Sequence, residues 1–371
     1  ILVVIGESHL ASTHLPREVR RVVGPRCRDV VIVQNVDDVY WRLMRRGREN
    51  AEAVRVGRNA YCVITASPML KYRSYREIID TWVDGDEADR NTPFLHETIE
   101  GILSFFVPGK GRPTATFRNG RRESLEAVLP EVQCRTTYHS FSSYLRSRRV
   151  STRGSSFALA RIKTKGIAYV PEINTFLVLA SDPDRKIEGA AEFVLRLLRQ
   201  EVGERPRKSP SALDDFYRAV VDDALVCFAA GVVNPARECT EGSALLSAAA
   251  SENANPAPLE GYPASEVREL VRLLRYCIEH APGARAASRA AKPLRRVTEL
   301  GIKKRMLIIE ALGARLGEGV HRAFHEGRIP EREILDLLRV PPYGPGAAVR
   351  LYRELAGRTR ERAPEPSART E

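Results

Sequence analysis

Apolar and polar positions alternate in blocks over the first 85 residues, as expected for strands that are each followed by a loop and a helix. Short continuous apolar runs predict strands buried in a sheet, and the amphipathic segments between them predict helices. The strands are expected at 1–5, 30–33 and 61–65, and the helices at 16–23, 37–54 and 75–83. Three such units in succession indicate a parallel sheet with crossover helices.

Shorter elements are expected in the middle of the chain. Helices are predicted at 91–107, 125–129, 141–148 and 188–201. Segments rich in β-branched and aromatic residues predict strands at 157–162, 167–170 and 176–179. The last two strands are expected to form a hairpin that turns at Asn174.

The chain changes character after 203–211, a stretch with the composition of a linker. Beyond it the pattern predicts helices at 213–231, 265–280, 293–317 and 331–338, and loops at 244–260 and 281–292. We therefore expect an α/β fold, mainly a parallel sheet flanked by helices, followed by an all-α C-terminal region. The expected domains are an α/β domain at 1–202, a helical domain at 212–357 and a disordered tail at 358–371.

The charge of the chain is strongly basic, with 59 basic and 47 acidic residues and a net charge of +12. The arginines are scattered and lack interleaved aromatics, which favours a solvated surface over a nucleic-acid partner. No apolar run is long enough for a transmembrane segment. Six cysteines without a CxxC spacing speak against a zinc knuckle and fit a reducing cytoplasm. Because the sequence opens on Ile1, a preceding lipobox cysteine and an envelope location stay open.

Polar segments follow the first three expected strands, at 6–14, 34–38 and 65–68. Because ligands bind outside the carboxyl ends of strands in open α/β sheets, we expect these segments to converge on one crevice. Glu7 and His9 would share a face of an extended segment, and His14 lies near a helix N-terminus that keeps imidazole neutral. A neutral imidazole can be a metal ligand, a haem ligand or a general base. The alternative is that Glu7 and His9 only satisfy backbone groups of a tight loop.

The segment Gly6-Glu7-Ser8-His9, with His14 after it, resembles the opening motif of the ChaN-like haem-binding uptake proteins of bacteria. These proteins share a superfamily with the Tiki/TraB proteins and the erythromycin esterases. The resemblance covers roughly residues 1–200, and a fainter one links 311–330 to helical extensions of bacterial paralogues. It implies haem binding and iron uptake, with His9 and His14 as ligands. It also implies an alternative, a hydrolase in which Glu7 and His9 are catalytic and act directly or through a divalent metal.

The chain departs from this family where a second Gly-x-x-His motif is expected, because residues 166–174 contain no histidine. Tyr169 could replace it as a haem ligand, and Glu172 could join Glu7, His9 and His14 at a divalent metal. The missing histidine also suits a third interpretation, a non-catalytic scaffold. The helical half would then bind a protein partner or form a homo-oligomer.

Other motifs are weaker. The chain has no phosphate-binding Gly-rich loop, no nucleophile elbow and no dinucleotide fingerprint. His321 and His325 share a helix face and could form a metal pair. With no Glu in an HExxH frame, a chance pair on the surface is the simpler interpretation.

Overall fold

The chain forms two compact units, which we call unit 1 (Ile1–Asp84) and unit 2 (Gly85–Glu371). The computed structural model describes residues 14–24, 30–46, 53–66, 87–106, 114–116, 122–135, 137–179, 182–199, 211–234, 241–250, 259, 262–280, 292–342 and 344–359. Within these ranges the chain forms 14 α-helices, two three-stranded sheets and one two-stranded hairpin. The expected fold class, a mainly parallel sheet flanked by helices, is therefore wrong: the chain is mostly helical.

The error has a physical cause in the pairing of strands. Both three-stranded sheets are mixed, with one parallel and one antiparallel pair. A strand pattern shows that a segment is extended, but it does not show which segment lies beside it. In unit 1, the strand at Ala53–Gly57 falls partly within an expected helix and pairs antiparallel with its neighbour.

Unit 1 is a small sheet with a helix on one face. Its elements are α1 (Leu15–Val23), β1 (Val31–Gln34), α2 (Asp37–Arg45), β2 (Ala53–Gly57) and β3 (Ala60–Val63). The strand order is β1-β3-β2, with β1 and β3 parallel.

Helix α2 covers one face of this sheet. Its Val39 and Leu43 pack on Cys62, whose thiol is buried. The side chains of alternate strand residues point to the other face. There Ile32 and Tyr61, which are register partners on β1 and β3, are 56% and 39% exposed. One face of the sheet therefore forms the core of unit 1.

Unit 2 begins with a helix and a second mixed sheet. Its elements up to residue 199 are α4 (Glu87–Phe106), β4 (Thr114–Thr116), β5 (Arg122–Ser124), α5 (Leu125–Val128), β6 (Glu131–Cys134), α6 (Tyr138–Ser147), α7 (Thr152–Lys165), β7 (Ile167–Val170), β8 (Thr175–Val178) and α8 (Pro183–Leu198). The strand order is β6-β8-β7, with β6 and β8 parallel.

The hairpin expected around Asn174 is confirmed. Strands β7 and β8 are antiparallel, and Asn174 turns the chain with a left-handed φ of 46°, which asparagine tolerates. The strand expected at 157–162 is wrong, because these residues lie inside α7. Ser151 caps the start of α7 and Gly166, with a φ of 69°, ends it. Phe141 of α6, Ile162 of α7 and Leu177 of β8 pack together, which joins these two helices to the sheet.

The rest of unit 2 is helical in the part of the chain that the structure describes. The helices are α9 (Ala212–Val233), α10 (Glu241–Ala250), α11 (Ala264–Glu279), α12 (Lys292–Glu299), α13 (Ile302–His325), α14 (Glu331–Arg339) and α15 (Ala347–Thr359). Helix α10 occupies part of an expected loop, and Gly301 divides an expected single helix into α12 and α13. The Ala-rich stretch that forms α10 has the composition of a good helix former.

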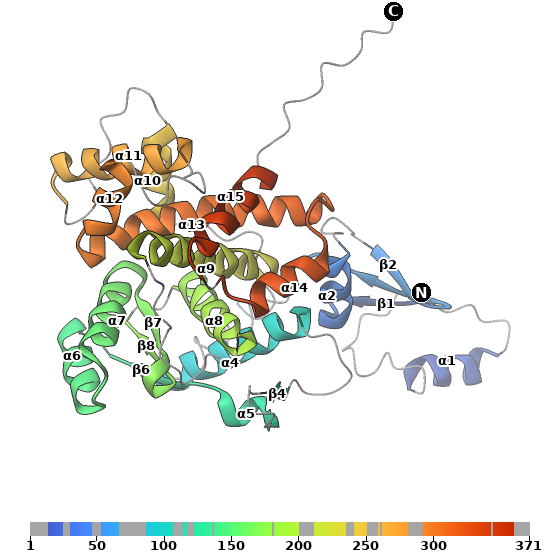
Figure 1. Cartoon of the computed structure of the whole chain (residues 1–371). Coiled ribbons are helices and arrows are strands. Elements are labelled where there is room, and N and C mark those ends of the chain that lie inside the picture. Colours follow the sequence, from blue (N-terminus) through green and yellow to red (C-terminus); the bar gives the residue numbers. More distant parts are fainter. Residues whose placement is uncertain are drawn as a thin grey trace, which may run out of the picture. The chain divides into compact units, whose positions relative to one another are not determined.

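Helices α9 and α13 lie side by side at the centre of unit 2 (Figure 1). They approach closely because glycines face the neighbouring helix. A Cβ added at Gly317 would lie 2.5 Å from Cys227 Cβ and 2.6 Å from the carbonyl oxygen of Ala224. Further toward the C-terminus of both helices, a Cβ added at Gly231 of α9 would lie 3.3 Å from the His321 ring of α13. The contacts advance in the same direction on both helices, which are therefore parallel.

Helices α8 and α9 pack together, and Arg199 pairs with Asp222 at 2.7 Å. The expected domain bounds at 202, 212 and 357 stay predictions, and residues 360–371 of the expected tail lie outside the described residues. No helix in the described ranges combines the length and apolar character needed to cross a membrane.

Candidate functional site

Polar side chains meet at the carboxyl ends of β1 and β3 in unit 1. Asn35 Oδ1 accepts hydrogen bonds from the backbone amides of Thr65, at 2.7 Å, and Ala66, at 3.1 Å. Thr65 Oγ1 accepts from Gln34 Nε2 at 2.9 Å and from Asn35 Nδ2 at 3.1 Å. We call Gln34, Asn35 and Thr65 the strand-end cluster. Two of the three segments expected to converge, 34–38 and 65–68, are therefore joined.

The local backbone explains why these side chains meet. Because β1 and β3 are adjacent and parallel, their carboxyl ends lie at the same edge of the sheet. Asn35 has a left-handed φ of 53°, which turns the chain sharply after β1. Its backbone amide also donates to the Val63 carbonyl at 2.9 Å, so the turn is tied to β3.

The strand-end cluster can bind polar groups of a ligand. Gln34 and Thr65 are exposed, and Asn35 is half-buried. Amide and hydroxyl groups both donate and accept hydrogen bonds, but they do not ionise near neutral pH. The cluster is therefore suited to orienting a ligand and not to acid–base catalysis.

His14, the expected haem or metal ligand, precedes α1. Its backbone carbonyl accepts hydrogen bonds from the amides of Arg17 and Glu18 at 3.0 and 3.1 Å. Its side chain is exposed and does not cap the helix. The ring is thus available to a ligand. Glu7 and His9, with the rest of Gly6-Glu7-Ser8-His9, lie outside the described residues.

Tyr169, the other expected haem ligand, is enclosed in unit 2. It is 1% exposed, and its hydroxyl hydrogen-bonds Asn174 Oδ1 at 2.9 Å. The rings of Phe176 and Phe193 lie 5.3 Å from its own ring. Burial raises the pKa of the Tyr169 phenol well above its ordinary value, so the side chain is neutral. These contacts tie the turn between β7 and β8.

Glu172, the expected metal ligand, holds Ser151, the residue that caps helix α7. Its carboxylate accepts hydrogen bonds from the Ser151 amide at 2.9 Å and from the Ser151 hydroxyl at 2.5 Å. This anchors the start of α7 to the segment between β7 and β8. Within the described residues, no three His, Cys, Asp or Glu side chains are grouped to hold a metal ion.

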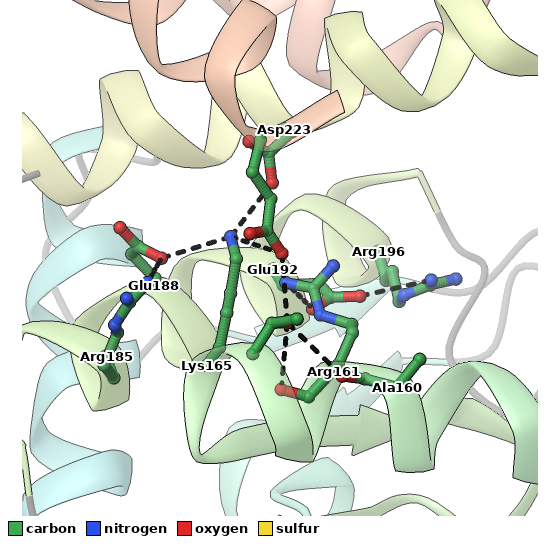
Figure 2. A network of polar contacts seen from close by, with 10 residues as sticks. Ala160, Arg161, Lys165, Arg185, Glu188, Glu192, Arg196 and Asp223 are labelled. Carbon is green, nitrogen blue, oxygen red and sulfur yellow. Dashed lines mark hydrogen bonds and ion pairs between the residues drawn. The ribbon is translucent and has the colours of Figure 1, made fainter. Parts of the chain in front are cut away.

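A network of buried charges joins four helices of unit 2, as Figure 2 shows. Lys165 of α7 lies 3.2 Å from Glu188 of α8, 3.1 Å from Asp223 of α9 and 4.0 Å from Glu310 of α13. One turn earlier, Arg161 pairs with Glu192 of α8 at 2.9 Å. We call these six residues the buried ionic network. All six side chains are close to nine-tenths buried.

The network keeps its cations charged. Burial alone would lower the pKa of Lys165, but Asp223, Glu188 and Glu310 outweigh it and raise that pKa. Burial raises the pKa of both Asp223 and Glu310, and Lys165 offsets this only in part. For Glu192, burial is outweighed by Arg161 and Arg196, which lower the pKa of that carboxyl. The network thus holds ionised pairs together with carboxyls that take up protons readily.

Sequence reasoning missed this network because each charge is isolated in its own segment. Asp223 follows Asp222 directly and precedes an apolar stretch of α9, and Glu310 stands between Ile309 and Ala311. A single charge inside an apolar run, as at Glu310, is the available signal, since buried charges must be paired. Each member of the network faces an opposite charge in the packed interior, which suits a role in joining helices. No family model matches this chain, and no curated protein or solved structure matches it either.

Proposed function

We propose that this chain is a ligand-binding protein whose site lies at the carboxyl edge of the unit 1 sheet, with haem or iron as the ligand. The observation that carries this proposal is the strand-end cluster, in which Asn35 and Thr65 join the ends of two parallel strands. The sequence places Gly6-Glu7-Ser8-His9 directly after an apolar run, as 34–38 and 65–68 follow β1 and β3. By that analogy, Glu7 and His9 belong to the same edge.

The residues assigned to haem or metal differ in how well they fit. The His14 ring fits because it is exposed and is not needed to cap α1. The contacts of Tyr169 and Glu172 are with Asn174 and Ser151, which does not suit a ligand role. His9 and His14 would hold haem iron through imidazole nitrogen, and Gln34 and Thr65 would supply hydrogen bonds to polar groups of the ligand. The strand-end cluster itself supplies polar contacts and no acid or base, so a hydrolase would have to use Glu7 and His9 for both roles.

A hemin titration of the full chain tests this proposal, with the Soret band as readout. We expect a band that shifts on binding in the wild type and fails to shift when His9→Ala and His14→Ala are combined. His139→Ala is the matched control, because His139 is exposed but lies in unit 2. An identical Soret shift in the double variant would overturn the proposal.

Two further measurements distinguish which part of the ligand is bound and where. Protoporphyrin IX without iron and Fe²⁺ alone separate recognition of the ring from recognition of the metal. Thr65→Val keeps the shape of the side chain but removes the oxygen that Gln34 and Asn35 share, and should weaken binding severalfold. Ester or phosphoester turnover that is lost in Glu7→Gln would favour the hydrolase alternative instead.

A further inference from the structure

Two histidines of α13 lie one turn apart on the same face of the helix. The Nε2 atoms of His321 and His325 are 3.2 Å apart. The ring centroids are 4.4 Å apart and the ring planes are inclined at 62°. The two nitrogens therefore face each other.

Aromatic side chains and the backbone of α9 pack against the two imidazole rings. The ring of Phe228, on α9, lies 5.9 Å from His321, and Phe324 lies 5.3 Å from His325. A Cβ added to Gly231 would lie 3.3 Å from His321 Cδ2, so the ring rests against the α9 backbone. Both histidines are half-buried, which leaves a path to solvent. The pair is thus positioned by the neighbouring helix and still accessible.

We propose that His321 and His325 bind a divalent transition-metal ion of the zinc class through their Nε2 atoms. Zinc binds imidazole nitrogen at about 2.0–2.1 Å. At the observed Nε2 separation of 3.2 Å, such an ion would see the two nitrogens at roughly 100°, close to a tetrahedral angle. Imidazole ligands suit zinc, copper and nickel, whereas calcium and magnesium prefer oxygen.

The contact between the two rings prepares the site. Two imidazole nitrogens at this distance share a proton, one ring donating and the other accepting. When the metal binds, each ring presents a bare Nε2, so the donating ring carries its proton on Nδ1 instead. Among the described residues, no third His, Cys, Asp or Glu is grouped with the pair, so the proposal concerns these two imidazole ligands.

Titration calorimetry with Zn²⁺ alone tests this site in a full-length background that carries His9→Ala and His14→Ala. This background separates the outcome from that of the proposed function. We expect zinc to bind, and His321→Ala or His325→Ala to weaken binding about tenfold or more, because the second imidazole acts at high effective concentration. His280→Ala is the matched control, since His280 is exposed on α11 and stacks on Tyr276. Unchanged affinity in both His321→Ala and His325→Ala would overturn the proposal.

A second measurement does not depend on the folding of these variants. With Cu²⁺ alone as the probe, the electron paramagnetic resonance spectrum of the same background should show coupling to two imidazole nitrogens. A spectrum with one nitrogen or none would overturn the proposal. His325→Gln, checked by circular dichroism, should reduce the coupling to one nitrogen.

Discussion

Replacing Lys165 by methionine tests the buried ionic network directly. Lys165 Nζ lies 3.1 Å from Asp223, 3.2 Å from Glu188 and 4.0 Å from Glu310. At an effective dielectric constant of ~20, each attraction is worth about 4–5 kcal/mol before desolvation. Burying the charges cancels much of that sum, but removing the ammonium alone leaves three carboxylates buried without it. We expect Lys165→Met to lower the free energy of unfolding by about 3–5 kcal/mol.

The loss should depend on pH. In the wild type, burial already raises the pKa of Asp223 and Glu310, and the variant removes the cation that opposes this. The folded variant then binds more protons than the unfolded chain at pH values above the ordinary carboxyl range. Its stability therefore falls as pH rises through the raised pKa values. The difference from the wild type should be smaller near pH 5 than near pH 8.

Thermal and urea unfolding followed by helical circular dichroism measures this effect. We expect the midpoint temperature to drop by on the order of 10 °C. Lys163→Met is the matched control, because Lys163 is exposed on the same helix and should change stability by less than about 0.5 kcal/mol. Adding Asp223→Asn to Lys165→Met should recover part of the loss. A loss below about 1 kcal/mol, or one that is independent of pH, would refute the reasoning.

Further substitutions test other contacts by the same unfolding assay. Gly317→Ala should cost about 1–3 kcal/mol because the added Cβ meets Cys227 and Ala224, whereas Gly357→Ala, with open space around it, should gain up to about 1 kcal/mol. Equal stability of the two variants would show that α9 and α13 can move apart enough to accept the added Cβ at Gly317. Glu172→Ala should cost about 1–2 kcal/mol because the start of α7 loses its acceptor, and Glu172→Gln should cost less. An unchanged midpoint in Glu172→Ala would show that Glu172 does not stabilise the cap at Ser151.

The sequence predicts elements whose signals are local. The hairpin at Asn174 needs only two β-rich segments and a residue that accepts a left-handed backbone. Helix α9 was expected at 213–231 and runs from Ala212 to Val233, with Ser211 as its cap. By contrast, residues 157–162 are rich enough in apolar residues to resemble a strand. Their helical state follows from the cap at Ser151 and the stop at Gly166.

Features that depend on distant pairing could not be read in the same way. The mixed sheets require a choice of neighbours that no single strand encodes. The strand-end cluster was expected in outline because parallel strands bring their carboxyl ends together. The contact of Lys165 with Asp223 joins residues 58 positions apart, and each looks like a solvated charge in its own segment.

The close contact of α9 and α13 has a consequence for the chain as it leaves the ribosome. Helix α9 is buried over most of its surface, and part of that cover comes from α13. The chain between the two helices takes about 3–14 seconds to synthesise at about 5–20 residues per second. During that interval the apolar surface of α9 is exposed because α13 has not yet been made. Nascent chains that stop before α13 should therefore be bound by chaperones.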